Sequence, residues 1–526
     1  MAETFDVVVA GGGHNALVAT AYLSLGGFEC CVLDARPIMG GDTATEELTL
    51  PGFRHDTCST AHNLIQASPT LRDDELGLLS DYGLTYVRPD PVVHIPFPDG
   101  TSLTQWRDLD RTCDEFAKFA RADGEAFRRM ISEYDRAKAA FGAYRYTPIG
   151  WGPSLAQRLA ELPDGHRWLR RQAESAWDVI QREFEDPHTR AFMLWMSFMT
   201  LQPPENAGTG WLAYSLPFGR QQHSWTLPKG GSGELPAALS RLIEAHGGTL
   251  LPGRRVVELV LEGGKCAGVR TDNEEEFRAR RAVLSSIHIA HLPRLAPDGA
   301  WGDDFLAGVR EWRQGVSMFV THYATTEPPR FEDGLEAVAS GTVASVDRLL
   351  RIGWDVRRRA LAIDDPPLLV VCPTVADPER APAGRHTLKI IGFHPYELAD
   401  GGAERWQEVK DDVSEANLEH VRRYAPNLTD AKIETTLVKS PVDLEALNEH
   451  NWRGSCHGGE MSPAQMGGLR PVPGWAEHRL PIAGLYQTGS TTHPGASVSA
   501  APGRNAAAVM LRDFGTSIEE VVARAR

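Results

Sequence analysis

The first 34 residues pass from a short apolar run to a glycine-rich turn, a helical pattern and a second apolar run. Residues 5–10 (FDVVVA) are rich in β-branched side chains, which is typical of a strand buried in a parallel sheet. Residues 15–25 follow a helical pattern that stops at Gly26-Gly27, and residues 29–34 (ECCVLD) predict a second strand. This order predicts a βαβ unit.

Two later stretches add further strands and helices of the same kind. Residues 235–246 predict a helix, with Pro236 in its first turn and Gly247-Gly248 just past its end. A hairpin turning at Gly263-Gly264 and a last strand that runs into a glycine are also expected. The predicted segments are strands at 249–251, within 254–270, at 277–287 and at 484–490, and a final apolar helix ending near Gly515.

The regions between these stretches differ in the secondary structure that their patterns predict. Residues 114–141 predict one long amphipathic helix. Residues 188–201 predict a helix that is apolar nearly all round, which suits either a buried core helix or the wall of a large apolar tunnel. The region 290–455 mixes expected strands with one helix. These strands are at 317–323, 368–372 and 387–393, and the helix is at 403–424.

Length and charge narrow the classes of protein that fit. A chain of 526 residues suggests three or four structural units, yet no repeat and no linker longer than a loop separates them. With 54 Lys and Arg against 70 Asp and Glu, the net charge of −16 makes the chain a poor general binder of nucleic acid. The first strand begins too early to leave room for a secretory signal, and no 18-residue apolar stretch exists.

The cysteines and histidines carry no metal or disulfide pattern. The seven cysteines form no CxxC pair, and Cys30 and Cys31 are expected on opposite faces of one strand. Free thiols of this kind suit a reducing compartment. The 18 histidines are scattered, and no HExxH or zinc spacing is present, so no metal site is predicted.

The glycine-rich turn carries the strongest chemical signal. Residues 11–16 (GGGHNA) match GxGxxA, in which Gly11 permits a tight turn, Gly13 lets the backbone approach a pyrophosphate, and Ala16 lets the helix pack on the strand. The helix N-terminus offers free N–H groups to the phosphates. Asp34 ends the second strand about 20 residues later, where a ribose hydroxyl is bound in such units. The pattern predicts a dinucleotide site and leaves NAD and FAD open.

Further segments favour FAD and resemble one family. Residues 36–45 (RPIMGGDTAT) place a Gly-Gly pair beyond the second strand, and residues 51–56 (PGFRHD) follow. Residues 225–233 (WTLPKGGSG) enter the helix at 235, and residues 484–497 (GLYQTGSTTHPGAS) form a strand, Gly, Thr-His-Pro-Gly motif. Together these segments resemble the phytoene desaturase-like FAD-dependent oxidoreductases, which include carotenoid desaturases and a retinol saturase.

The resemblance implies the fold class and its division along the chain. It implies an α/β fold with a Rossmann-like FAD-binding domain of the glutathione-reductase-like type, interleaved with an α+β substrate domain. The FAD-binding domain would comprise residues 1–65, 225–290 and 456–526. The substrate domain would comprise a mostly helical insertion at 66–224 and a sheet-containing insertion at 291–455.

The same resemblance implies which residues bind FAD. Val256 or Val257 would reach the adenine, and Ser490 stands where many FAD proteins have an Asp that holds a ribityl hydroxyl. The helix after the Thr-His-Pro-Gly motif would face the flavin and stabilise negative charge on it. The expected cofactor-binding residues are Gly11, Gly13, His14, Asn15, Ala16, Asp34, Ala35, Arg36, Gly40, Gly41, Asp42, Thr43, Val256, Val257, Gly489, Ser490, Thr492, His493, Ser497 and Val498.

Candidate acid–base residues are few, because flavin performs hydride chemistry with the protein supplying position and electrostatics. His493 is the first candidate, since the resemblance places it beside the flavin and its pKa suits neutral pH. A histidine that only shapes the turn is the alternative. Lower-ranked candidates are His62, His14, Glu46, Glu47 and, as a loop lysine approaching the flavin, Lys229.

Three functions compete. The first is a desaturase, saturase or isomerase acting on C–C bonds of an apolar isoprenoid-like or polyketide-like small molecule, supported by the Met- and Trp-rich insertion. The second is an amine or alcohol oxidase using oxygen. The third is an FAD-holding interaction protein without catalysis. A cytoplasmic location is expected. By resemblance such enzymes work at a membrane surface, while the net charge opposes attraction to anionic lipid, so peripheral membrane contact stays open.

Overall fold

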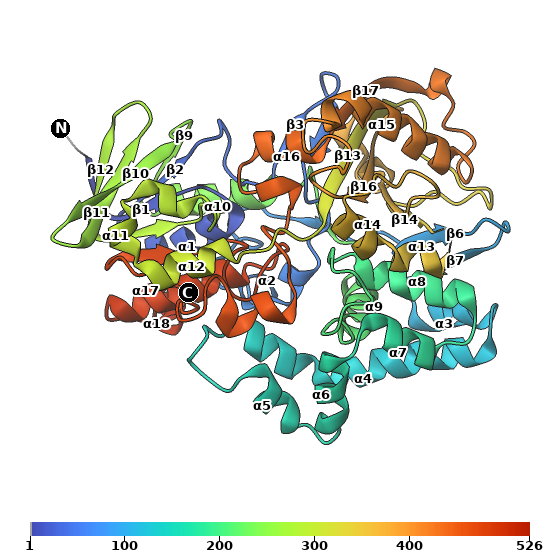
Figure 1. Ribbon diagram of the computed structural model, residues 1–526, viewed down its shortest axis with the longest axis horizontal. Helices are drawn as coiled ribbons and strands as arrows, with labels where there is room; N and C mark the ends of the chain where they lie inside the picture. The colour runs from blue at the N-terminus through green and yellow to red at the C-terminus, as the bar shows by residue number, and fades with distance from the viewer. Residues whose placement is uncertain (1–2, 344, 526) are drawn as a thin grey trace.

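Two seven-stranded sheets organise the chain, whose computed structural model describes residues 3–343 and 345–525. The first sheet has the order β10-β11-β12-β1-β2-β9, with β18 paired to β12, and the second has the order β17-β13-β16-β15-β14-β6-β7. They lie in opposite halves of the molecule (Figure 1). The first comprises β1 (Glu3–Ala10), β2 (Cys30–Asp34), β9 (Thr249–Pro252), β10 (Val256–Glu262), β11 (Lys265–Thr271), β12 (Glu276–Ser285) and β18 (Leu485–Gln487), and the second β6 (Val93–Pro96), β7 (Ser102–Gln105), β13 (Ser317–Thr325), β14 (Ala339–Thr342), β15 (Leu368–Val371), β16 (His386–His394) and β17 (Ile433–Lys439).

The first sheet has a helical layer on one face. Its central strand β1 runs parallel to β2 and β12, and both faces of β1 are buried. Val7 and Cys30 pack with the helices, whereas Val8 and Cys31 pack in a separate core on the other face, as the strand alternation predicts. The helices are α1 (His14–Leu25), α10 (Glu234–Ala245), α17 (Ala501–Asp513) and α18 (Ile518–Ala525).

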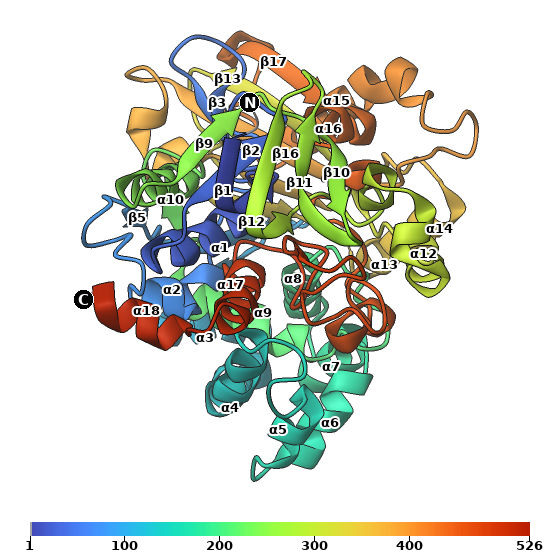
Figure 2. The same cartoon turned by 90° about the vertical axis from the view of Figure 1, so that its left-hand side faces the viewer.

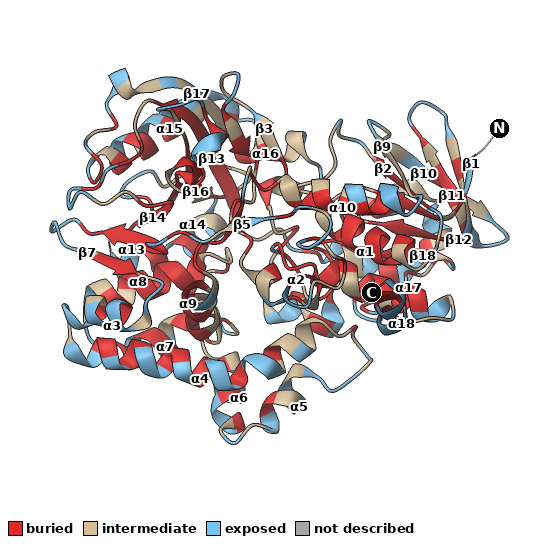
Figure 3. Ribbon diagram, turned by 180° about the vertical axis from the view of Figure 1, so that it is seen from behind, coloured by how far each residue is buried: buried red, intermediate tan, exposed pale blue. Residues whose placement is uncertain are grey.

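The second sheet separates two layers. On one side, Leu388 and Ile390 of β16 pack in a core with residues of α15 (Trp406–Arg422). On the other side lies the helical insertion, whose α4, α5 and α6 project from the body of the molecule (Figure 2). Buried residues concentrate in the central strands of both sheets and in the helices that flank them, whereas the edge strands β10 and β17 are mostly intermediate or exposed (Figure 3). The insertion comprises α3 (Leu109–Ala117), α4 (Arg121–Arg145), α5 (Leu155–Ala160), α6 (Gly165–Ala173), α7 (Ala176–Glu183), α8 (Pro187–Phe198) and α9 (Leu212–His223).

One predicted helix is wrong. The single helix expected over residues 114–141 is two helices, α3 and α4, because Ala120 is extended and turns the chain between them. The two helices then cross closely at Gly124, where a Cβ would come within 2.5 Å of the Cys113 carbonyl oxygen. The buried Asp123 carboxylate accepts N–H groups at the start of α8, which fixes the turn to a third helix.

Four strands of the second sheet, β6, β7, β14 and β17, were not predicted. Of these, β6 and β7 come from the insertion expected to be mostly helical, and β6 pairs with β14 next to the edge strand β7. The apolar run at 92–97 and the Asp99-Gly100 turn were the available signal. The helix expected at 188–201 is α8, whose side chains from Phe192 to Phe198 are buried in one core, while Met199 and Leu201 just after it line a cavity, so both alternatives hold for part of the segment.

The α/β fold class is confirmed, while its fine subclass and the domain boundaries stay predictions. All strands of the first sheet lie within 1–65, 225–290 and 456–526, the three segments expected to form one domain. No helix within residues 3–343 and 345–525 combines the length and apolar character needed to cross a membrane.

Candidate active site

A cavity of about 820 Å³ lies where the two sheets face each other. Its first side, the glycine-rich wall, comes from the loops at the ends of the first sheet's strands. Its second side, the apolar wall, comes from the second sheet and from the chain just after α8. The glycine-rich wall comprises residues 11, 13–16, 33–37, 41–43, 46, 254–257, 286–288, 489–490 and 497–498. The apolar wall comprises Met199, Leu201, Met318, Leu369, Val371, Ile391 and Phe393.

The glycine-rich turn is shaped by its surroundings. Gly11 has a φ of +98°, and a Cβ there would lie 2.4 Å from Ser286 Oγ, so no other residue fits without a shift. A Cβ on Gly13 would meet no atom within 4 Å. Helix α1 follows Gly13 without a side-chain cap, which leaves N–H groups of its first turn for an anion.

Asp34 is fixed as a hydrogen-bond acceptor at the same end of the cavity. Its Oδ2 accepts the Gly12 N–H at 2.6 Å, and its Oδ1 accepts the Arg36 N–H at 2.7 Å. Burial raises the pKa of Asp34, although these backbone hydrogen bonds oppose the shift. A carboxylate held in this way can accept ribose hydroxyls with its remaining lone pairs.

The lining fits the expected FAD. The buried atoms His14 Nε2 and Asn15 Oδ1 have no hydrogen-bond partner, and both residues line the cavity. A bound dinucleotide would supply partners for polar atoms whose burial is otherwise costly. Phosphates would be held by the first turn of α1, and the adenosine end by Asp34 and the 254–257 strand. When bound, flavin supplies a two-electron acceptor.

Most of the expected cofactor residues line this cavity, and three do not. Thr492 donates from Oγ1 to the Gly489 carbonyl at 2.9 Å and shapes the turn. Gly40, with a φ of +121°, accepts N–H groups of His14 and Thr43 and holds the two glycine segments together. His493 is the third. The other expected residues, including Ala35, Arg36, Gly41, Asp42, Thr43, Val256, Val257, Ser497 and Val498, all line it.

The expected catalytic histidines lie away from the cavity surface. The Nε2 of His493 contacts the Tyr144 carbonyl at 3.1 Å, and burial lowers the pKa of His493 to about 3. The Nε2 of His62 contacts Ser232 Oγ at 2.7 Å, and burial lowers the pKa of His62 to about 3. Both residues are absent from the lining, so their catalytic roles stay predictions without a cavity contact.

The lower-ranked candidates differ in whether they line the cavity. His14 lines the cavity, and burial with the nearby His450 lowers its pKa to about 4. Glu46 also lines it but pairs with Arg36 at 2.7 Å. Glu47 is exposed, and Lys229 pairs with Glu379 at 3.4 Å; both lie outside the lining.

A segment that the sequence did not single out closes the glycine-rich wall. Asn448 Nδ2 and Asn451 Nδ2 donate to Asp42 Oδ1 at 2.8 and 3.1 Å. His450 Nε2 lies 2.5 Å from Ser490 Oγ, so the serine in place of the usual aspartate has a histidine partner. These contacts join chain positions more than 400 apart in the case of Asp42, and no local pattern signals them.

Lys389 is the second group that was missed. It lies on β16, whose alternation turns Lys389, Ile391 and Phe393 toward the cavity. Its Nζ donates to the Cys58 carbonyl, to Thr60 Oγ1 and to the Asp56 carbonyl, at 2.7, 2.8 and 3.2 Å. Burial lowers the pKa of Lys389, although Asp56 opposes the shift. A lone lysine in the apolar run TLKIIGF was the available signal.

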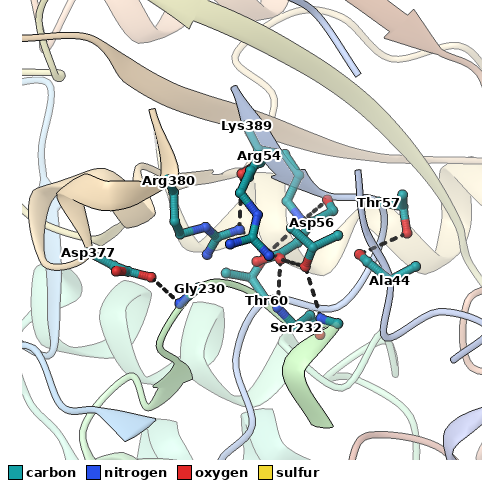
Figure 4. A network of polar contacts seen from close by, with 12 residues as sticks. Ala44, Arg54, Asp56, Thr57, Thr60, Gly230, Ser232, Asp377, Arg380 and Lys389 are labelled. Atoms are coloured by element: carbon teal, nitrogen blue, oxygen red, sulfur yellow. Dashed lines mark hydrogen bonds and ion pairs between the residues drawn. The ribbon is translucent and has the colours of Figure 1, made fainter. Parts of the chain in front are cut away.

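An ion pair behind Lys389 joins the two halves (Figure 4). The carboxylate of Asp56 pairs with Arg380 at 2.7 Å, and both side chains are fully buried. Asp56 Oδ1 also accepts the Ser232 N–H at 2.8 Å, and Asp377 Oδ2 accepts the Gly230 N–H at 2.7 Å. The loop at 225–233 is therefore fixed by carboxylates from two other segments.

Comparisons with known proteins show which family and which relatives this chain is similar to. The family model of flavin containing amine oxidoreductases matches residues 17–511. One of the subunits of limonene dehydrogenase from Castellaniella defragrans is 28% identical over 98% of this chain and 97% of its own length. A lycopene-forming phytoene desaturase of Pseudescherichia vulneris is 25% identical over 96% of this chain and 99% of its own. A putrescine oxidase structure is 15% identical, with 100% of both chains covered, and superimposes with a TM-score of 0.63, which shows a likeness of fold.

Proposed function

Because this chain belongs to the flavin containing amine oxidoreductase family and is an FAD-dependent oxidoreductase, we propose that it dehydrogenates C–C bonds of an apolar isoprenoid-like hydrocarbon. The resemblance to phytoene desaturase-like enzymes and the FAD cofactor are confirmed. The substrate class is the new element, and it rests on the apolar wall of the cavity.

The apolar wall carries the proposal. Its seven side chains are all hydrophobic, so a hydrocarbon placed against them leaves no polar side chain of the wall without a hydrogen-bond partner. Met199 and Met318 add adaptable surface, which suits long or irregular apolar ligands. Two relatives with near-complete coverage are named for limonene and phytoene, both isoprenoid hydrocarbons.

The charges near the apolar wall disfavour an amine substrate. Lys389 and Arg220 line the cavity, and Arg220 lies over the Trp225 ring at 3.6 Å. Burial lowers the pKa of Arg220 to about 9, which leaves it protonated at neutral pH. The acidic lining residues Asp34, Asp42 and Glu46 belong to the glycine-rich wall, and Glu449 pairs with Arg255 at 2.7 Å. An ammonium group would therefore meet cations, not a carboxylate.

The chain's own groups have three tasks in this reaction. The apolar wall orients the hydrocarbon and excludes water. The first turn of α1 and Asp34 hold the dinucleotide, as their geometry allows. Lys389 has its three donors bonded to protein oxygens, so it contributes fixed positive charge rather than a mobile proton.

Product analysis tests the substrate class. The FAD-loaded protein would be incubated with limonene, phytoene, a primary amine and an alcohol, each with an artificial electron acceptor. We expect a product that lacks two hydrogen atoms from at least one hydrocarbon, identified by mass spectrometry. Hydrogen peroxide released in proportion to an oxidised amine or alcohol, with both hydrocarbons unchanged, would contradict the proposal.

A further inference from the structure

Two cysteines from distant parts of the chain meet on the cavity surface. Cys58 follows β4 (Arg54–Asp56), and Cys456 follows the short helix η6 (Trp452–Gly454). Both line the cavity, and both pack against the same apolar cluster around Met318. Cys456 Sγ lies 3.1 Å from Met318 Sδ, and Cys58 packs against the same small cluster, which consists of Met318, Val320, Ile391 and Leu444.

The other described cysteines have no such position. Each of them is buried in a core, and each is absent from the cavity lining. They are Cys30, Cys31, Cys113, Cys266 and Cys372. The pair at the cavity is therefore distinguished from ordinary core thiols by both access and proximity to a second thiol.

The pair lies where the glycine-rich wall meets the apolar wall. Beside Cys58, the Ser59 N–H donates to the Asp42 carbonyl of the glycine-rich wall at 3.0 Å. Two residues after Cys456, a Cβ on Gly458 would lie 2.1 Å from Ser490 Oγ. Each cysteine thus lies within two residues of a position next to an expected FAD-binding residue, Asp42 or Ser490, and its own side chain packs against the apolar cluster.

A buried cation stands next to one thiol. Lys389 Nζ donates to the Cys58 carbonyl at 2.7 Å. The hydrogen bond to Cys456, followed by burial, raises the pKa of the Cys58 thiol, while Lys389 opposes the shift. The resting Cys58 side chain is therefore a thiol, and the lysine favours the thiolate that forms when its proton leaves.

We propose that Cys58 and Cys456 form a redox-active dithiol that exchanges an electron pair with the bound flavin. Two S–H bonds break and one S–S bond forms; the electron pair passes to the oxidised flavin, and the protons pass to the flavin and to solvent. The reverse reaction regenerates both thiols. The inference rests on the FAD of the family and not on the hydrocarbon substrate, so each can fail without the other.

Electron counting tests the dithiol. The holoprotein would be oxidised anaerobically with the thiol oxidant diamide, freed of reagent and titrated with dithionite. Wild type should take up four electrons per FAD, two for the flavin and two for the disulfide, and Cys456→Ser should take up two. Cys113→Ala, which removes a thiol outside the lining, should still take up four.

Peptide mapping of the same oxidised wild type needs no variant. We expect one cross-linked peptide that joins the segments around Cys58 and Cys456 and that disappears on reduction. Recovery of both as separate thiols, together with uptake of only two electrons per FAD, would overturn the proposal. A cross-link without the two additional electrons would overturn the exchange with flavin.

Discussion

The two walls of the cavity are built in different ways. The glycine-rich wall uses short contiguous segments whose backbone groups and single carboxylates face the ligand, as with residues 11–16 and Asp34. The apolar wall uses single side chains from separate elements, such as Met199 after α8 and Phe393 on β16. A common cofactor needs a fixed backbone shape, whereas a particular substrate needs only a surface of suitable size and polarity. The first wall therefore identifies the chemistry and the second selects the substrate.

Adding a charge to the glycine-rich wall should have the largest effect. A carboxylate about 4 Å from a phosphate repels it by about 4 kcal/mol, so Gly13→Asp should bind FAD about 1,000-fold more weakly, measured by fluorescence titration of the apoprotein. Gly13→Ala is the matched control, because a Cβ there meets no atom within 4 Å. Equal flavin content in wild type and Gly13→Asp would refute the placement of the pyrophosphate.

Breaking the ion pair between the halves should lower stability. Arg380→Met leaves Asp56 buried without its partner and should reduce the free energy of unfolding by about 3–5 kcal/mol. Burial alone would raise the pKa of Asp56, but Arg380 and then Lys389 bring it below its ordinary value. That contribution is present at neutral pH and is lost as the pH falls through the folded-state pKa.

Urea unfolding at two pH values checks that the stabilisation from this ion pair decreases as the pH falls. The difference between wild type and Arg380→Met should be large at about pH 7 and smaller at about pH 3, where Asp56 becomes protonated in the unfolded chain. Arg385→Met, which removes an exposed pair with Glu434, should change stability by less than about 1 kcal/mol. A difference that grows on acidification would contradict the assignment.

Placing a charge on the apolar wall should lower turnover of the substrate without affecting FAD binding by the glycine-rich wall. Met199→Glu should keep its flavin but lose at least about 10-fold in kcat/KM for a hydrocarbon, because a carboxylate replaces an apolar contact. Met199→Leu, which keeps volume and polarity, should stay within about 2-fold. Loss of flavin from Met199→Glu would show that the walls are not independent.

The smallest effect is expected at His493. Its ring contacts the Tyr144 carbonyl outside the cavity lining, so His493→Asn should change kcat by less than about 3-fold. Since burial lowers the pKa of His493 to about 3, the pH profile above neutrality should also be unchanged. A large kcat loss with a shifted pH profile would restore His493 as a catalytic residue.

The strands of the first sheet could be predicted from the sequence because the patterns that indicate them are local. The βαβ unit, the hairpin at Gly263-Gly264 and the strand before Gly489 each follow from patterns within about 20 residues. The same reasoning placed most of the glycine-rich wall, because phosphate binding by a helix N-terminus is encoded in one turn.

The missed features are non-local. The link from Asn448 to Asp42 spans 406 positions, and β6 joins β14 through His94 and Ser340, which lie far apart in the sequence. The division of residues 114–141 depends on close contact between α3 and α4 at Gly124, which tertiary packing decides. His493 lies in a motif that resembles a flavin site, but its ring packs on Tyr144. Such outcomes depend on which segments meet, and one sequence does not reveal that.

Anaerobic mixing of the oxidised holoprotein with one substrate at a time tests the central claim most directly. An isoprenoid hydrocarbon that fits the apolar wall should remove the yellow colour of the oxidised flavin in a single turnover and yield a product with one additional C=C bond. A primary amine should leave the colour unchanged. Bleaching by the amine and not by any hydrocarbon, or no bleaching by any compound tried, would contradict this account.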